Sequence, residues 1–143
     1  MEKSEKEKQE WKEYRLSILE QKSKSDDDFE KYITLIASGA LGLTLTFIDK
    51  ISPLKESVAV WVIAIGWILL ALTLFINLVS HFLSSKLNEK TIQDIDDKIN
   101  YDILIERIDN RNKIISNLNL ISIILLGLGI IKILIFTIIN AYQ

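Results

Sequence analysis

The feature that most constrains this chain is a long run without charge. Residues 58–80 contain no Asp, Glu, Lys, Arg or His, whereas residues 1–31 contain 18 charged side chains. A bilayer removes charge from about 20 consecutive residues, because a helix of that length crosses its hydrocarbon core. A helix of a soluble protein instead keeps one polar face. This segregation favours a membrane protein over a soluble helical bundle with a very apolar core.

Three segments are apolar enough to cross a bilayer as helices, at about 1.5 Å per residue. We predict an all-α integral membrane protein with three transmembrane helices and amphipathic helices in its charged segments. In the first loop, Ser52 suits the cap of the second spanning helix and Pro53 its first position. The predicted segments are a charged N-terminal helix (1–31), the first span (32–48), a short loop (49–57), the second span (58–82), a longer loop (83–117), the third span (118–139) and a tail (140–143).

The distribution of Lys and Arg predicts the orientation. The N-terminal segment has eight, the short loop two, the longer loop six and the tail none. Basic residues accumulate on the cytoplasmic side of spanning helices. We therefore expect the N-terminus and the longer loop inside, and the short loop and the tail outside. For a bacterial chain this means the inner membrane.

The two charged segments carry thin apolar stripes at helical spacing. In the longer loop we expect a helix break at Asp109–Asn112, and in the N-terminal segment a turn starting at Ser25 or Asp26. Such stripes must pack on each other or on neighbouring subunits. The stripes are Trp11, Tyr14, Ile18 and Leu19 in the N-terminal segment, and Ile92, Ile95, Ile99 and Ile103 in the longer loop.

A basic group in the longer loop allows two interpretations. Arg107, Arg111 and Lys113 are close in sequence, near the predicted inner membrane surface. Repeated guanidinium and ammonium groups in a ring of subunits would hold phosphates, which is a hypothesis of anionic-ligand sensing. Basic residues beside a span more commonly contact lipid headgroups or enforce topology.

Each span has one face of small and polar residues. Such faces pack closely between helices, or they line a water-filled pore between subunits. The candidate pore or helix-interface residues are Thr34, Ser38, Gly42 and Thr46 in the first span, Gly66, Thr73 and Asn77 in the second, and Ser122, Gly129 and Lys132 in the third.

Lys132 is the one charge inside a predicted span. It lies seven residues before Ile139, about 10 Å from the outer edge, so its stem could snorkel to the interface. The alternative is that it faces protein or water, with Thr44, Thr46 and Asp49 as candidate partners. Three helices do not enclose a wet pathway, so a water-facing Lys132 implies a homo-oligomer, for which we take a tetramer as the starting hypothesis.

The residues that carry common enzyme chemistry are sparse. The chain has one His and no Cys, and its carboxylates are spread over charged helices. No nucleophile elbow, phosphate loop or metal-ligand spacing is present. We therefore expect no enzyme, no metal and no cofactor, because an active site needs polar groups that converge at one place.

Two stretches resemble a known class of proteins. Ser38–Lys50 (SGALGLTLTFIDK) and Trp67–His81 (WILLALTLFINLVSH) are similar to the membrane effectors of Hailong-type antiphage systems, and more loosely to effectors of nucleotide-signalling immunity. The resemblance covers residues 30–90. It implies an oligomeric inner-membrane channel that depolarises the infected cell. It also implies a nucleotide or oligonucleotide ligand made by a partner nucleotidyltransferase.

The sequence thus predicts a homo-oligomeric channel or pore-type effector gated through its cytoplasmic helices. The alternative is a non-conducting membrane anchor or assembly protein that recruits a cytoplasmic partner.

Overall fold

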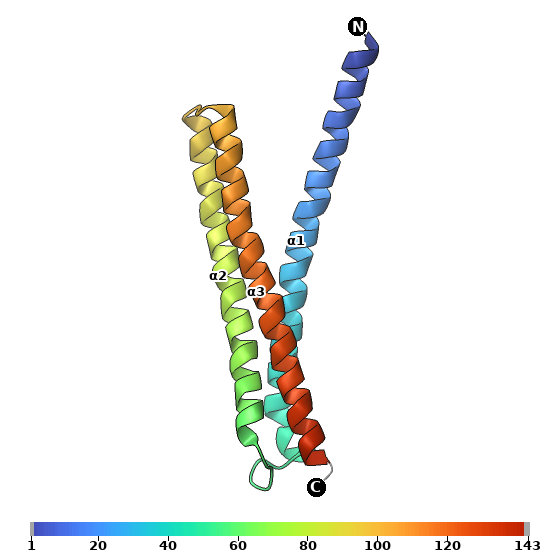
Figure 1. Cartoon of the computed structure of the whole chain (residues 1–143), viewed down its shortest axis with the longest axis vertical. Helices are drawn as coiled ribbons and strands as arrows, with labels where there is room; N and C mark the ends of the chain where they lie inside the picture. The colour runs from blue at the N-terminus through green and yellow to red at the C-terminus, as the bar shows by residue number, and fades with distance from the viewer. Residues whose placement is uncertain (1, 142–143) are drawn as a thin grey trace. The chain divides into compact units, whose positions relative to one another are not determined.

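The computed structural model describes the backbone of residues 2–141, and every element in that range is helical. The chain forms three long helices, α1 (Glu2–Ile51), α2 (Val60–Asp96) and α3 (Tyr101–Ala141) (Figure 1). The prediction of an all-α fold is confirmed for these residues. The last two residues of the predicted tail, 142 and 143, and the side chains of Trp11 and Leu19 lie outside the described part.

Helix α1 is continuous from Glu2 to Ile51, so the predicted turn at Ser25 or Asp26 is wrong. Residues 2–38 contain neither Gly nor Pro, the two residues that interrupt helices most readily. The helix ends just before Pro53, the single proline of the chain, which cannot continue a helix beyond its first turn. The amide of Ser52 donates the last bond, 2.7 Å to the Ile48 carbonyl.

The prediction that Ser52 and Pro53 open the second spanning helix is also wrong. These residues form a compact turn in which the Pro53 carbonyl accepts the amides of Glu56 and Ser57, both at 3.0 Å. Helix α2 begins only at Val60, after Ala59 in the left-handed conformation (φ 54°, ψ 38°), and no side chain caps it. The turn closes around Pro53, so the helix starts where the chain leaves that turn.

Helices α2 and α3 lie side by side and antiparallel (Figure 1). They are joined at residues 97–100, so the predicted break at Asp109–Asn112 is wrong. Lys98 takes a positive φ of 52° at the turn. The side chain of Asn100 accepts the Asp102 amide at 2.9 Å and caps α3. The stretch Asp109–Asn112 has no comparable reversal and continues as helix.

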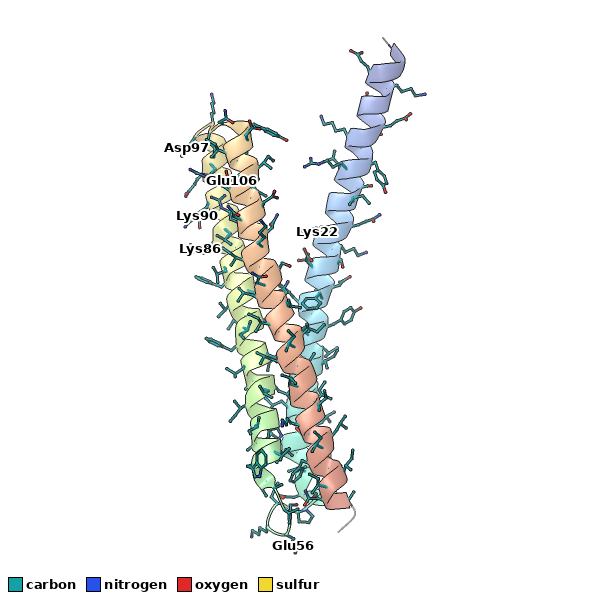
Figure 2. All side chains as sticks on the ribbon, viewed as in Figure 1. Lys22, Glu56, Lys86, Lys90, Asp97 and Glu106 are labelled. Atoms are coloured by element: carbon teal, nitrogen blue, oxygen red, sulfur yellow. The ribbon has the colours of Figure 1, made fainter. Side chains whose placement is uncertain are left out.

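The three helices are long and apolar enough, by length and composition, to cross a membrane. Helix α2 has 37 residues and α3 has 41. At about 1.5 Å per residue both exceed 50 Å, so each is longer than the hydrocarbon core of a bilayer, which is about 30 Å thick. Figure 2 places Lys86, Lys90, Asp97 and Glu106 in the part of α2 and α3 nearest their turn, and Glu56 at the opposite end. We call residues 83–117 the helical hairpin.

The chain divides into two compact units, Met1–Tyr32 and Ile33–Gln143. The second unit contains residues 33–51 of α1 together with α2 and α3. Its core is narrow and includes Ala37, Ile63, Leu70 and Phe136, all fully buried. Many large apolar side chains on the outside of these helices are exposed, such as Leu35, Phe75 and Leu78. Such a surface is compatible with a location in a membrane, where lipid would cover it.

Candidate functional site

Two glycines bring α2 and α3 into backbone contact. A Cβ built on Gly66 would lie 3.2 Å from the Gly129 carbonyl oxygen, and a Cβ on Gly129 would lie 3.2 Å from the Gly66 carbonyl oxygen. The same Cβ on Gly129 would also lie 2.9 Å from a methyl carbon of Leu70. Helix pairs in membranes depend on such close approach, because lipid tails are as apolar as the helix surface. Both glycines were predicted interface residues, and they meet here.

Several polar residues of α2 and α3 form hydrogen bonds within the chain. Ser80 donates to the Asn119 side chain at 3.0 Å, joining α2 to α3. Asn140, near the end of α3, bonds both the amide and the carbonyl of Val58, at 2.8 and 3.2 Å. Thr73 is fully buried and donates to the Leu69 carbonyl at 2.9 Å. Ser122 is fully buried, and its hydroxyl has no hydrogen-bond partner among the described residues.

Two side-chain hydrogen bonds hold residues 33–51 of α1 against α2. Asn77 donates to the Thr34 hydroxyl at 2.7 Å, and the Trp67 indole donates to the Thr44 hydroxyl at 3.0 Å. Sequence reasoning singled out Thr34 and Asn77 but missed the Trp67–Thr44 bond. The sequence does indicate such a bond, because Trp67 lies in the middle of a predicted span and a buried indole N–H needs an acceptor.

The remaining predicted residues of α1 face outward. Ser38, Gly42 and Thr46 are exposed, and nothing lies within 4 Å of a Cβ built on Gly42. The Ser38 hydroxyl donates to the Thr34 carbonyl and that of Thr46 to the Gly42 carbonyl, both at 2.7 Å. These hydroxyls are satisfied by their own helix, yet α1 presents a small and polar surface that α2 and α3 do not cover.

Lys132 lies beside the glycine contact. Its Cβ would be 3.4 Å from a Cβ on Gly66, and the residue is half-buried. The predicted partners have other bonds: Thr44 accepts from Trp67, and a carboxylate oxygen of Asp49 accepts the Leu54 amide at 3.3 Å. Among the described residues, no hydrogen bond or ion pair holds the Lys132 ammonium.

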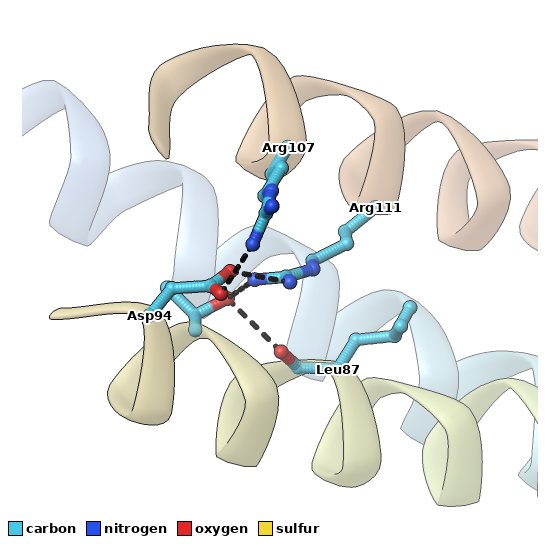
Figure 3. A network of polar contacts seen from close by, with 5 residues as sticks. Leu87, Asp94, Arg107 and Arg111 are labelled. Carbon is cyan, nitrogen blue, oxygen red and sulfur yellow. Dashed lines mark hydrogen bonds and ion pairs between the residues drawn. The ribbon is translucent and has the colours of Figure 1, made fainter. Parts of the chain in front are cut away.

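A carboxylate between two guanidinium groups joins the helices of the hairpin (Figure 3). Asp94 of α2 contacts Arg107 and Arg111 of α3, with both nitrogen–oxygen distances at 2.6 Å. Arg111 also donates to the Thr91 hydroxyl at 2.7 Å, and Thr91 in turn donates to the Leu87 carbonyl at 2.9 Å. The carboxylate is 12% exposed and Arg111 16%, whereas Arg107 is 50% exposed. We call this set the Asp94 cluster.

The charge state of the Asp94 cluster follows from these contacts. Burial raises the pKa of Asp94, but the hydrogen bonds from Arg111 and Arg107 outweigh it, so the pKa lies below its usual value. A lowered pKa means that the cluster stabilises the fold at and above the usual carboxyl pKa. The contribution is lost as the pH falls through the lowered value.

The Asp94 cluster includes two of the three basic residues of the predicted anion site. Arg107 and Arg111 do lie together, but each already binds Asp94. Lys113 is exposed and lies two residues from Arg111, about 200° around the helix, so it points elsewhere. No role for Asp94 or Thr91 was predicted from the sequence. Asp94 is the acidic residue on the inward face of its helix, and the next helix has two Arg residues four positions apart. This pattern indicates an ion pair between the two helices. The described residues contain no group of three potential metal ligands.

Comparison with known proteins identifies no relative of this chain. The chain matches no protein-family model, no curated protein and no solved structure. The helices themselves define an all-helical protein, in the described residues, with three helices long and apolar enough to span a membrane.

Proposed function

We propose that the chain is the subunit of a homo-oligomeric channel in a bacterial inner membrane, opened and closed through its cytoplasmic helices. The observation that carries this proposal is the uncovered face of α1. Ser38, Gly42 and Thr46 are exposed within a stretch long and apolar enough to span the bilayer. Small and hydroxyl-bearing faces of membrane helices pack on other helices or line water, rather than lipid.

The path for ions would lie between copies. At Gly66 and Gly129 the backbones of α2 and α3 touch, which leaves no passage between these two helices at that level. Ser80, Asn77 and Asn140 are also occupied by bonds within the chain. Helix α1 is the element whose polar face remains for contact between copies, so a shared path would run beside the line along which the α1 helices of neighbouring copies meet.

The proposed biological role is antiphage defence by membrane depolarisation. The resemblance of Ser38–Lys50 and Trp67–His81 to Hailong-type effectors supports this role. A nucleotide or oligonucleotide from a partner nucleotidyltransferase would be the controlling ligand. If it bound Arg107 and Arg111, it would have to compete with Asp94, whose carboxylate already occupies both guanidinium groups.

Ion flux tests the channel directly. Purified chain in liposomes should dissipate an imposed ion gradient, and Lys132→Leu should change the ratio of anion to cation permeability. The change removes the one charge within the proposed spans, and the field of that ammonium extends through the low-dielectric membrane to ions in a path along α1. Lys132→Arg keeps the charge and is the matched control. Absence of flux for wild type and both variants would remove the channel proposal.

A second candidate function is a non-conducting anchor that recruits a cytoplasmic partner. The Asp94 cluster favours it, because two ion pairs make the hairpin a stable projection beyond the span. The same liposome experiment separates the two functions. An anchor leaves the gradient intact although the protein is inserted.

The proposed topology has its own test. The C-terminus should be external, because three spans follow a cytoplasmic N-terminus. Alkaline phosphatase, which folds to an active form only outside the cytoplasm, should be active when fused after Gln143. Activity of a cytoplasmic reporter at the same position would overturn the topology.

A further inference from the structure

We propose that copies of this chain meet in parallel along one line of α1. This line, the outer seam, follows alternating steps of four and three residues and comprises Tyr14, Ile18, Gln21, Ser25, Asp28, Tyr32, Leu35, Gly39, Gly42 and Thr46. The inference rests on the homo-oligomeric part of the proposed function. It assigns the interaction surface and its occupant, the same surface of a second copy.

Eight of the ten residues of the outer seam are exposed, and Asp28 and Gly39 are half-buried. Tyr14 is 59% exposed, Ile18 43% and Leu35 66%. Gly39 lies two residues, and so about 200°, from the fully buried Ala37. The seam is therefore on the side of α1 opposite the residues that pack against α2 and α3 in the membrane part.

Lipid does not explain the first part of the seam. Tyr14 and Ile18 precede the first span, at Tyr32, by more than ten residues, and they lie in a segment dense in charge. Tyr14 and Ile18 are four residues apart on one side of the helix, so the same surface of a second copy would cover both. Steps of four and three residues are the spacing with which parallel helices pack knobs into holes.

The charges that flank the seam complement a second parallel copy. Glu10 precedes Arg15 by five residues, and the two lie on opposite edges of the seam. Between parallel helices in register, these are the positions that form interhelical ion pairs. Both side chains are exposed, and a Glu10 carboxylate would thus meet Arg15 of the second copy.

Within the proposed first span, the side chains of the seam are small at Gly39 and Gly42. Nothing lies within 4 Å of a Cβ built on Gly39 or Gly42. Glycines allow neighbouring backbones to approach closely, which is the main source of helix association in lipid. Copies inserted by the same rule have the same direction, so Gly39 and Gly42 would face their counterparts.

The middle of the seam is polar and sets the register. Gln21, Ser25 and Asp28 occupy it, and a shallow depression is lined by Gln21, Lys24, Ser25, Asp28, Phe29 and Tyr32. Polar residues at seam positions specify register at a cost in stability. Lys31 lies 3.9 Å from Asp28 and offsets the repulsion between Asp28 carboxylates of two copies.

Paired serines test the seam without altering the fold. Ser25 lies on the seam and Ser23 about 200° away, both are exposed, and the natural chain has no Cys. In membranes containing the full chain, oxidation of Ser25→Cys should give several-fold more disulfide-linked dimer than oxidation of Ser23→Cys. Equal linkage, or more from Ser23→Cys, would overturn the seam.

The disulfide experiment and the ion-flux experiment can contradict the seam and the channel independently of each other. Selective linkage at Ser25→Cys without ion flux in liposomes keeps the seam and removes the channel. Ion flux without selective linkage keeps the channel and removes the seam, because the copies would then meet elsewhere.

Discussion

Gly129→Leu should destabilise the folded chain more than any other single glycine change, by about 3 kcal/mol. Even the first added carbon would lie 2.9 Å from a buried methyl group of Leu70 and 3.2 Å from the Gly66 carbonyl oxygen. The backbone oxygen cannot move without separating α2 from α3. Separation also strains the Ser80–Asn119 hydrogen bond. Reversible unfolding in mixed micelles, followed by circular dichroism, measures the loss.

Gly127→Leu is the matched control for this prediction. Gly127 is in the same helix, and nothing lies within 4 Å of a Cβ built on it. Both substitutions replace Gly by Leu within a helix, so the difference between them isolates packing from helix propensity. Equal stability of the two variants would contradict a close contact at Gly66 and Gly129.

Asp94→Ala should open the helical hairpin while leaving the spans folded. The change removes the carboxylate that neutralises Arg107 and Arg111, and Arg111 is largely buried. A buried charge that loses its partner is strongly unfavourable. We expect amide hydrogen exchange in the hairpin to accelerate by about tenfold or more, the scale of a lost charge-assisted hydrogen bond. Exchange between Gly66 and Leu70 should stay unchanged.

Two further variants show whether the effect belongs to the ion pairs. Asp96→Asn removes an exposed carboxylate two residues away and should leave exchange unchanged. Each single variant leaves the charge of the other residue unpaired, whereas the double variant Asp94→Ala/Arg111→Met removes both charges. The double variant should therefore lose less protection from exchange than the sum of the two single variants. Strict additivity would show that Asp94 and Arg111 act independently.

The sequence was sufficient for the helical class and for three helices long and apolar enough to span a membrane, because apolar runs of this length have few alternatives. The helix ends were harder to predict. Ser52 and Pro53 resemble a helix start in isolation, but the Pro53 carbonyl instead closes a turn with Glu56 and Ser57. The hairpin turn falls at Lys98 rather than at Asp109, where local composition offered a polar break but no residue took a positive φ.

The sequence predicted which residues share a helix face, but it did not predict which residues of different helices contact each other. Helical spacing placed Gly66, Thr73 and Asn77 on one side of α2, and all three are buried. Spacing does not reveal which helix a face meets, so it predicts neither the Trp67–Thr44 hydrogen bond nor the exposure of Ser38 and Thr46. Arg107 and Arg111 looked available for a ligand because their partner, Asp94, lies on the preceding helix.

Current recordings from purified chain in a planar bilayer test the central claim most directly. A homo-oligomeric channel predicts discrete unitary currents, with a permeability ratio that changes in Lys132→Leu and is retained in Lys132→Arg. A silent bilayer, although Ser25→Cys in the same preparation forms linked dimers, would contradict the claim. The chain would then be an assembled but non-conducting membrane protein.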